Sequence, residues 1–321
     1  MGVSELALAI VRVTNIGALA SYTYICGKIL RKPFVYVVRK RALGDVLWIE
    51  PLIRQLAARN KKVIVYTKYP ELFLHYPLPH IEFKSSLSLF EKIIWKLERF
   101  FHRSFFFIDL ETAYEGQPKM HFLHAYQQSA KLPVTTEYPR LYLDEKERAF
   151  GSPVPGKYVV LHLESMTDRN YRKVYGVNWE AIAASLKLKG FTVLLIGKEP
   201  APVAGAIPVK TSIREMMGLI GNASFFLGID SGPSHIAAAL GIPSLVFFGA
   251  VNPDFRHFME LFKGRILQQY CEFAGCYHER VGAMEPSCRL VGDEGVPKCS
   301  LHTTEYVLNN INLLLKDYHI S

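Results

Sequence analysis

The segment with the sequence GIDSGPSHIAAALGIP, residues 228–243, brings a carboxylate, a hydroxyl and an imidazole within six positions. We expect a hydrophobic strand to end at Asp230 and a helix to begin directly after the turn that follows. The unpaired N–H groups and the dipole at the start of a helix attract anions. Ser231 and Gly232 would let a diphosphate approach the backbone, and His235 would donate to a phosphate oxygen. The alternative is that Asp230 or Ser231 only caps the helix and that His235 is an ordinary surface histidine.

A second carboxylate, Asp45, follows a basic cluster and a glycine in the sequence RKRALGDVL, residues 39–47. Asp45 is either the cap of a helix or a general base that removes a proton from an acceptor hydroxyl, and position alone leaves both interpretations open. The neighbouring cations would keep this carboxylate ionised and attract an anionic acceptor. The expected acceptor-binding residues are Arg39, Lys40, Arg41 and Gly44.

A late segment, residues 271–299, holds four of the five cysteines: Cys271, Cys276, Cys288 and Cys299. Four thiolates at loop spacing could hold Zn²⁺ or an iron ion tetrahedrally. Such a site would be structural, because a saturated four-thiolate ion has no open position for catalysis. The alternative is that the cysteines are reduced thiols, or form disulfides only after purification.

The elements that must position these residues alternate between strands and helices from residue 34 onward. In the first half we expect strands at Phe34–Arg39, Val63–Thr67 and Phe105–Leu110 and a helix at Asp45–Arg59. In the second half we expect strands at Tyr158–Leu163, Phe191–Gly197, Ser224–Ile229 and Ser244–Phe248, and helices at Asn178–Lys189, Ser212–Gly221, Pro233–Leu240 and Thr303–Asp317. This alternation predicts an α/β protein with parallel sheets.

A charged and then Gly/Pro-rich stretch, Asp144–Lys157, has the composition of a linker. It predicts two Rossmann-like domains, residues 1–150 and 151–321, that face each other across a cleft. Ligands of open parallel sheets bind beyond the carboxyl ends of the strands, so the cleft is the expected active site.

The composition excludes several classes of protein. Half of the 321 residues are hydrophobic and 21% are charged, which excludes a disordered, collagenous or coiled-coil chain. The formal net charge of +9 points to a polyanionic partner such as a nucleotide, a phosphorylated lipid or a nucleic acid. A generally basic surface is the alternative.

The N-terminal segment, residues 1–32, contains an apolar stretch at residues 5–27 followed by basic residues. Arg12 interrupts this stretch, so we expect neither a membrane span nor a signal peptide. An apolar helix beside a basic cluster suits an anionic membrane surface, and the alternative is a helix packed on the first domain. We expect a cytoplasmic protein that is peripheral on the cytoplasmic face of the inner membrane.

Together the two motifs resemble those of the heptosyltransferase-like glycosyltransferases, family 9, which have the GT-B fold. That family carries Gly-Asp near its first strand, here Gly44-Asp45, and Asp-(Ser/Thr)-Gly-x-x-His-x-x-Ala-Ala in its second domain, here beginning at Asp230. The resemblance runs from about Phe34 to the C-terminus. It implies an inverting, metal-independent transfer of a sugar, such as heptose, from a nucleotide-sugar donor such as ADP-heptose to a lipopolysaccharide core or another glycolipid or glycan.

The resemblance also implies roles for individual residues. Asp45 takes the place of the general base, and a basic residue after the first strand of the second domain contacts the donor phosphate. Here the family's Trp-Pro does not follow Lys173, so the register between Arg172 and Lys173 stays open. The implied donor-binding residues are Arg172, Lys173, Thr211, Ser212, Asp230, Ser231, Gly232 and His235.

Two other functions fit part of these observations. A nucleotide-sugar epimerase would share the architecture and would act without an acceptor. A non-catalytic polyanion-binding protein would account for the charge, but no nucleic-acid-binding motif is visible and the basic residues are scattered apart from residues 28–41.

Overall fold

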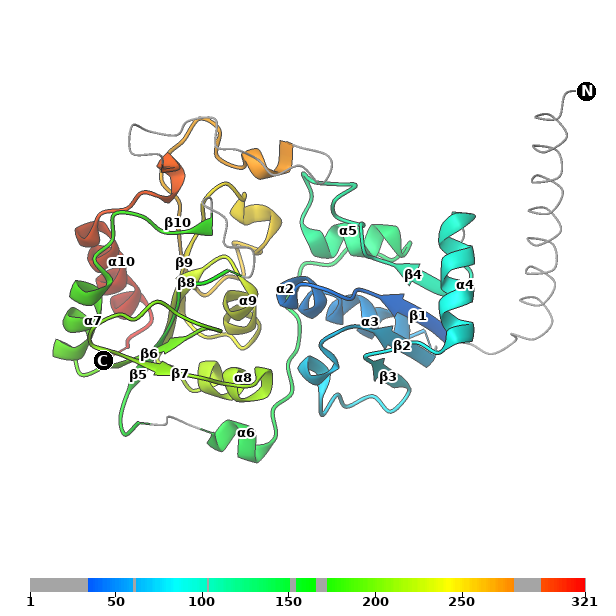
Figure 1. Ribbon diagram of the computed structural model, residues 1–321, viewed down its shortest axis with the longest axis horizontal. Helices are drawn as coiled ribbons and strands as arrows, with labels where there is room; N and C mark the ends of the chain where they lie inside the picture. Colours follow the sequence, from blue (N-terminus) through cyan, green and yellow to red (C-terminus); the bar gives the residue numbers. More distant parts are fainter. Residues whose placement is uncertain are drawn as a thin grey trace, which may run out of the picture.

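The computed structural model describes residues 34–59, 62–102, 104–150, 154–165, 172–279 and 296–320. Two parallel sheets lie side by side, each with helices against it, and the chain passes from the first sheet to the second through a short helix, α6 (Figure 1). The prediction of an α/β fold with two Rossmann-like parallel sheets is confirmed. The boundary near residue 150 falls between α6 and β5 and remains a prediction.

The first sheet has the strand order β3-β2-β1-β4, and all of its pairings are parallel. Its elements are β1 (Phe34–Val38), α2 (Leu43–Leu47), α3 (Glu50–Ala57), β2 (Lys62–Tyr66), the 3₁₀ helix η1 (Pro70–Phe73), β3 (Ile81–Lys84), α4 (Leu89–Phe100), β4 (Phe107–Asp109) and α5 (Phe122–Ser129). The central strand β1 is buried over four of its five residues, as expected for a parallel strand covered on both faces.

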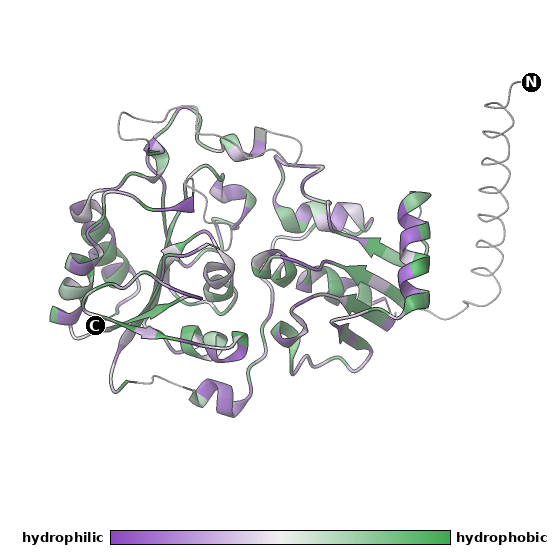
Figure 2. Ribbon diagram, viewed as in Figure 1, coloured by the Kyte–Doolittle hydropathy of each residue, from purple (hydrophilic) through white to green (hydrophobic). Residues whose placement is uncertain are grey.

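The second sheet has the order β10-β9-β8-β5-β6-β7, again with parallel pairings. Its elements are β5 (Tyr158–His162), α7 (Trp179–Leu188), β6 (Thr192–Ile196), β7 (Ala206–Val209), α8 (Ile213–Gly221), β8 (Phe225–Ile229), α9 (Gly232–Ala239), β9 (Ser244–Phe247) and β10 (Gly264–Leu267). The remaining elements are α6 (Glu145–Ala149), three 3₁₀ turns, η3 (Pro253–Phe255), η4 (Cys276–Glu279) and η5 (Lys298–Ser300), and α10 (Thr304–Asp317). The strands at the centre of both sheets are strongly hydrophobic (Figure 2).

The structure differs from the sequence expectation in three places. The helix expected at residues 45–59 is divided into α2 and α3, because Pro51 has no N–H to donate to the preceding turn. The expected linker is partly helical, since Asp144 and Glu147 form a reciprocal capping box at the start of α6. Strands β3, β7 and β10 and helices α4 and α5 were not expected.

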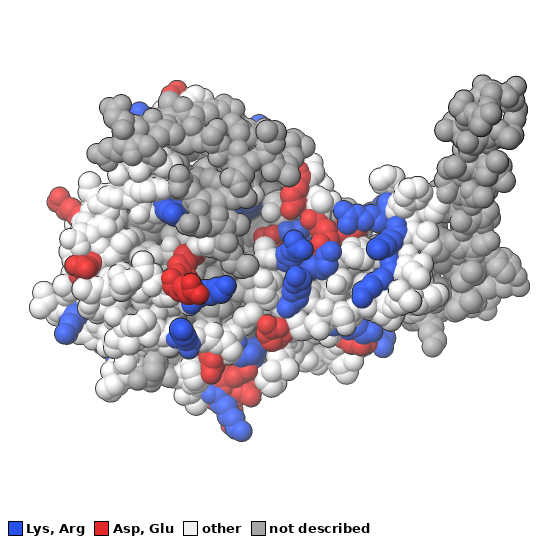
Figure 3. All heavy atoms as spheres, in the orientation of Figure 1, with Lys and Arg blue, Asp and Glu red and all other residues white. Residues whose placement is uncertain are grey.

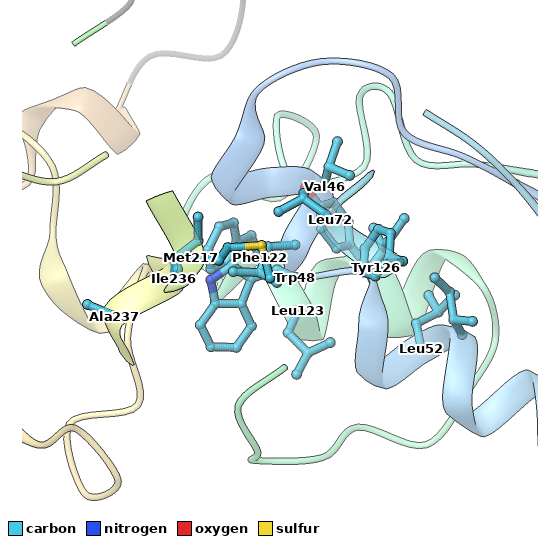
Figure 4. Close-up of a cluster of buried hydrophobic side chains, with 14 of the residues drawn as sticks. Val46, Trp48, Leu52, Leu72, Phe122, Leu123, Tyr126, Met217, Ile236 and Ala237 are labelled. Atoms are coloured by element: carbon cyan, nitrogen blue, oxygen red, sulfur yellow. The ribbon is translucent and has the colours of Figure 1, made fainter. Parts of the chain in front are cut away.

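A single hydrophobic cluster crosses from one sheet to the other. It contains Trp48 and Phe122 from the first half and Met217, Ile236 and Phe258 from the second, all of them buried. Figure 4 shows the side chains of Trp48 and Phe122 beside Met217 and Ile236. The two sheets are therefore joined by a packed apolar junction, and the expected cleft does not run along the whole boundary.

Helices α2 and α9 form the tightest part of this junction. A Cβ atom built on Gly44 would lie 2.5 Å from Cδ2 of His235, and one built on Gly232 would lie 2.9 Å from Cβ of Leu43. Both glycines therefore permit the close approach of the two helices. Because α2 follows β1 and α9 follows β8, the carboxyl ends of these two strands face each other.

Candidate active site at the junction of the two sheets

Asp45 lies in α2 and is held by a buried arginine. The guanidinium of Arg39, at the end of β1, donates to Oδ2 of Asp45. The same guanidinium donates to the carbonyl oxygens of Leu110 at 2.9 Å and Glu111 at 2.8 Å, so its position is fixed by the strand-to-loop turn after β4. The side chain of Asp45 keeps 17% of its surface exposed, whereas that of Arg39 keeps 6%. The arginine thus orients a carboxylate that solvent or a ligand can reach.

The backbone just before this carboxylate is strained. Ala42, the residue that precedes α2, has φ 62° and ψ 110°, which non-glycine residues rarely adopt. Such conformations persist where the surrounding structure fixes them, and they are frequent at functional sites. The strain fits a turn whose task is to present Asp45.

Two groups beside Asp45 respond to its charge. Tyr114 has a pKa well above its usual value, first because of the charge of Asp45 and then because of burial. Burial also raises the pKa of Glu115, whose carboxylate lies 3.7 Å from Arg39. The Arg39 guanidinium lies over the ring of Tyr114 at 5.2 Å. Asp45 therefore shares its arginine with a second, more exposed carboxylate.

The four residues predicted to bind an acceptor have different surroundings. Arg39 is 5% exposed, and its guanidinium positions Asp45. Gly44 is buried against His235, where it allows the close packing of the two helices. The predicted acceptor contacts of both residues stay predictions. Lys40 is half-buried and pairs with Glu111 at 3.0 Å, and Arg41 is exposed. Lys40 and Arg41 stay predicted acceptor contacts.

The turn between β8 and α9 is built around Asp230 and Ser231. The hydroxyl of Ser231 lies 3.1 Å from Nδ1 of His162 on the neighbouring strand β5 and donates to the carbonyl of Ile229. Burial lowers the pKa of His162 to about 4, so this histidine is neutral at pH 7. The Ser231 hydroxyl therefore makes its hydrogen bonds within the protein, and these bonds stabilise the turn.

Asp230 is a buried anion. Burial alone would raise its pKa, but the hydrogen bond from His235 and the charge of Arg172 lower the pKa well below its usual value. Its Oδ1 lies 3.5 Å from Nε2 of His235. Its Oδ2 is also buried and has no hydrogen-bond partner among the described residues. Asp230 is charged and fixed, with one oxygen still able to accept a bond.

Both ring nitrogens of His235 have partners within the protein, although the sequence suggested either a phosphate contact or a surface histidine. Its Nδ1 accepts a hydrogen bond of 3.2 Å from the indole N–H of Trp48, in the other half of the chain, and its Nε2 faces Asp230. The side chain of Leu43 packs against Gly232 at the same helix start. In this conformation α2 packs closely against the start of α9.

The other predicted donor contacts lie around this turn. Nη1 of Arg172 donates to the carbonyl of Asp230 at 3.2 Å, whereas Lys173 is exposed, so the geometry favours Arg172 as the phosphate contact. Ser212 caps α8, exchanging hydrogen bonds with Glu215 in a capping box, and Thr211 is half-buried just before it. The nucleoside-pocket assignment of Thr211 and Ser212 stays a prediction.

Arg256 is a candidate residue that the sequence did not single out. It is 4% exposed, and its guanidinium lies over the rings of Tyr114 at 5.3 Å and Phe122 at 5.2 Å in the other half of the chain. Its charge also acts on Asp230. Arg256 follows the Asn252-Pro253 turn after β9, the neighbour of β8, and this position beyond a strand end was the signal available in the sequence.

The cysteine cluster is only partly within the described residues. Cys271, Cys276 and Cys299 do not bring their sulfurs together in a three-ligand group, and Cys288 lies outside the described residues. Over the described ranges, the one group of three possible ligands is His75, Asp144 and Glu147, beside α6. Within the described residues the structure does not assemble the four-thiolate site, which remains a prediction. The apolar segment 5–27 also lies outside the described residues.

Comparison with solved structures defines the class of fold. The chain superposes on the iron-containing dodecameric glycosyltransferase TibC of enterotoxigenic Escherichia coli with a TM-score of 0.68 and 18% identity, covering 89% of this chain and 76% of that one. It superposes on the ADP-heptose lipopolysaccharide heptosyltransferase II of E. coli with a TM-score of 0.62 and 16% identity, covering 89% and 99% of the two chains. The fold is that of the GT-B heptosyltransferases.

Sequence comparison then shows which family part of the chain resembles. Residues 118–261 match the sequence model of glycosyltransferase family 9 (heptosyltransferase). Lipopolysaccharide heptosyltransferase 3 of E. coli K12 is 42% identical over 59 residues, 18% of this chain and 17% of that protein. Lipopolysaccharide heptosyltransferase 1 of Pseudomonas aeruginosa is 27% identical over 124 residues, 35% of this chain and 34% of that protein. These stretches of the chain are similar to glycosyltransferase family 9, and they span about a sixth to a third of the relatives compared.

Proposed function

We propose that this protein is an inverting glycosyltransferase that transfers a heptose-like sugar from an ADP-linked donor to a glycolipid or glycan acceptor such as a lipopolysaccharide core. The observation that carries the proposal is Asp45, a partly exposed carboxylate that is oriented by Arg39 and lies on α2, the helix that packs against α9. The choice of donor is supported by TibC, whose structure was determined in complex with ADP-D-β-D-heptose.

In this mechanism Asp45 removes the proton of the acceptor hydroxyl as that oxygen attacks the anomeric carbon. The bond from that carbon to the donor diphosphate breaks, and the negative charge of the leaving nucleotide grows. Arg172 and Arg256 are placed beside the Asp230 turn and supply positive charge there. With both cations in place, we propose that the transfer requires no catalytic metal ion, and that EDTA-treated enzyme keeps its rate.

The donor must first reach the start of α9. We propose that the α2 and α9 helices separate to admit the diphosphate, and that the Leu43–Gly232 and Trp48–His235 contacts re-form or shift on release. Opening of this kind would expose Gly232 N–H and allow His235 to turn toward a phosphate. Closure around the donor would then exclude water and limit its hydrolysis.

The test is binding followed by turnover. The melting temperature of the full chain should rise with ADP-heptose and rise less with UDP-, GDP- or CMP-linked sugars, because a ligand of the native state stabilises it. Transfer is then measured with heptose-deficient lipopolysaccharide as acceptor. Turnover of the nucleotide-sugar without any acceptor would favour the epimerase, and absence of any stabilisation would contradict the proposal.

A peripheral location on the cytoplasmic face of the membrane is part of the proposal. Within the described ranges no helix is long and apolar enough to cross a membrane.

A further inference from the structure

Helix α4 turns its two central carboxylates, together with Ile94 and Trp95, toward the protein, and leaves four other apolar side chains exposed to solvent. Glu98 is 1% exposed, and its two carboxylate oxygens accept the backbone N–H groups of Phe106 and Phe107, both at 3.0 Å. Glu91 accepts a 2.6 Å hydrogen bond from the hydroxyl of Tyr36. These bonds fix the rotation of the helix about its axis.

The outward side of α4 is a continuous apolar stripe. Four of its side chains remain largely exposed: Leu89 (75%), Phe90 (67%), Ile93 (48%) and Phe100 (65%). At 100° per residue, positions 89, 93 and 100 fall within about 40° of one another on the helix, and position 90 lies at the edge of the same side. We call these four side chains the α4 face. A clustered apolar surface of this kind marks a binding surface, whereas single exposed leucines do not.

Cations border the α4 face along one side. Lys92, Lys96 and Arg99 are exposed and lie on the adjacent arc of the helix. Neither lysine forms an ion pair with another residue of the described ranges, and Arg99 reaches Asp109 only at 3.9 Å. Figure 3 shows Lys and Arg side chains gathered on the first half of the molecule, beside the uncharged surface at the end where α4 lies.

An apolar stripe bordered by lysines and arginine fits the interface of an anionic bilayer. The apolar side chains would enter the boundary between headgroups and acyl chains, while the cations would meet lipid phosphates. A second copy of the chain fits less well, because a two-fold contact through the α4 face would bring like charges of two copies together. Charge complementarity therefore favours lipid over self-association.

Helix α4 also contacts the predicted acceptor residues. Trp95 of α4 donates its indole N–H to Asp109 at 3.0 Å, and the ammonium of Lys40 lies 4.7 Å from the centre of its ring. We propose that α4 is an interfacial helix that docks the protein on an anionic lipid bilayer through the α4 face, while Trp95 on the opposite side of the helix keeps its contacts with Asp109 and Lys40. The delivery of a lipid-linked acceptor to Lys40 rests on the proposed function, whereas the docking does not.

The experiment measures flotation of the full chain with vesicles of phosphatidylcholine that contain about one third phosphatidylglycerol, and with pure phosphatidylcholine vesicles. The double variant Leu89→Ser/Phe90→Ser should lower the partition coefficient about tenfold, because it removes two inserting side chains. Lys92→Gln/Lys96→Gln should lower it by a similar factor on anionic vesicles only. The control, Leu188→Ser on α7, removes a side chain that is 90% exposed elsewhere and should change nothing.

A second measurement detects insertion directly. Phe90→Trp should be quenched by brominated lipid in the anionic vesicles, whereas Leu188→Trp should not. Unchanged flotation of the Leu89/Phe90 variant would overturn the proposal and assign membrane binding to another part of the chain. A fall in molecular mass of that variant in solution would overturn it in favour of self-association. The vesicles contain neither donor nor acceptor, so the result is independent of whether the protein transfers a sugar.

Discussion

The two aspartates that follow β1 and β8 occupy matching places in their sheets and have different surroundings. Asp45 keeps 17% of its side chain exposed and has one strong partner, Arg39. Asp230 keeps 7% and is surrounded by His235 and the charges of Arg172 and Arg256. The contrast separates two tasks, because only a carboxylate that a ligand can reach exchanges a proton with it. Asp45 is suited to chemistry, and Asp230 to holding the α9 turn in place.

The largest expected effect is on turnover when Asp45 is changed. Asp45→Asn should lower kcat by about 10³-fold, within the range for loss of a general base, while calorimetric affinity for the donor stays within about threefold. The matched control is Glu115→Gln, which removes the other carboxylate near Arg39 and should leave kcat within about threefold. If Glu115→Gln abolished transfer and Asp45→Asn did not, the roles of the two carboxylates would be exchanged.

The next effect is on stability when Asp230 is changed. Asp230→Asn should lower the free energy of unfolding by about 3 kcal/mol in urea denaturation, since it breaks a buried charge network. Because the folded-state pKa of Asp230 is lowered, its contribution is present above its usual pKa and is lost as the pH falls. Asp254→Asn, at an exposed position, is the control and should stay near wild type. Equal loss in both variants would show that the buried charge of Asp230 does not stabilise the fold more than an exposed carboxylate does.

A smaller effect concerns the histidine that supports Ser231. The pKa of His162 is lowered to about 4 by burial, so the folded protein resists its protonation. Stability from this group is present above pH 6.5 and is lost as the pH falls from 6.5 toward 4, by about 2 kcal/mol at pH 5. His162→Gln should flatten that part of the stability curve, measured by urea denaturation at several pH values, whereas His75→Gln, at an exposed histidine, should not. A curve that His162→Gln leaves unchanged would show that other groups cause the acid loss.

The smallest effect is at the bond between the halves. Trp48→Phe keeps the ring and removes the N–H that Nδ1 of His235 accepts, so it should cost about 1 kcal/mol of unfolding free energy. If the α2–α9 contact must open for the donor, the same variant should bind ADP-heptose at least as tightly as wild type. Weaker donor binding by Trp48→Phe would mean that the closed contact belongs to the donor-bound state. Trp179→Phe on α7, away from the junction, is the control.

Local sequence predicted the elements whose signals are local. The turn and helix at residues 230–239 appeared as expected, because strand end, small residues and helix start are adjacent in the chain. The capping residues Asn178, Ser212 and Thr303 likewise fixed the starts of α7, α8 and α10. Asp45 was found for the same reason.

Features that depend on contacts between distant residues were missed. The hydrogen bond between Trp48 and His235 joins positions that are 187 residues apart, and neither local sequence predicts it. Arg39 was expected to bind an acceptor, and its hydrogen bonds to the carbonyls of Leu110 and Glu111 were missed because those residues follow a different strand. Helix α4 was not predicted because its glutamates face the protein. Periodicity arguments assume that charged residues face solvent and apolar residues face the core.

The apolar cluster that crosses the junction has a consequence for recombination between relatives. Trp48 and Phe122 fit against Met217, Ile236 and Phe258 of the other half, and packed cores tolerate volume changes poorly. A chimera that joined the first half of this chain to the second half of a distantly related protein would inherit mismatched side chains along that seam. The two halves therefore constrain each other's sequences, and an exchange of one half between such proteins requires these contact residues to be exchanged with it.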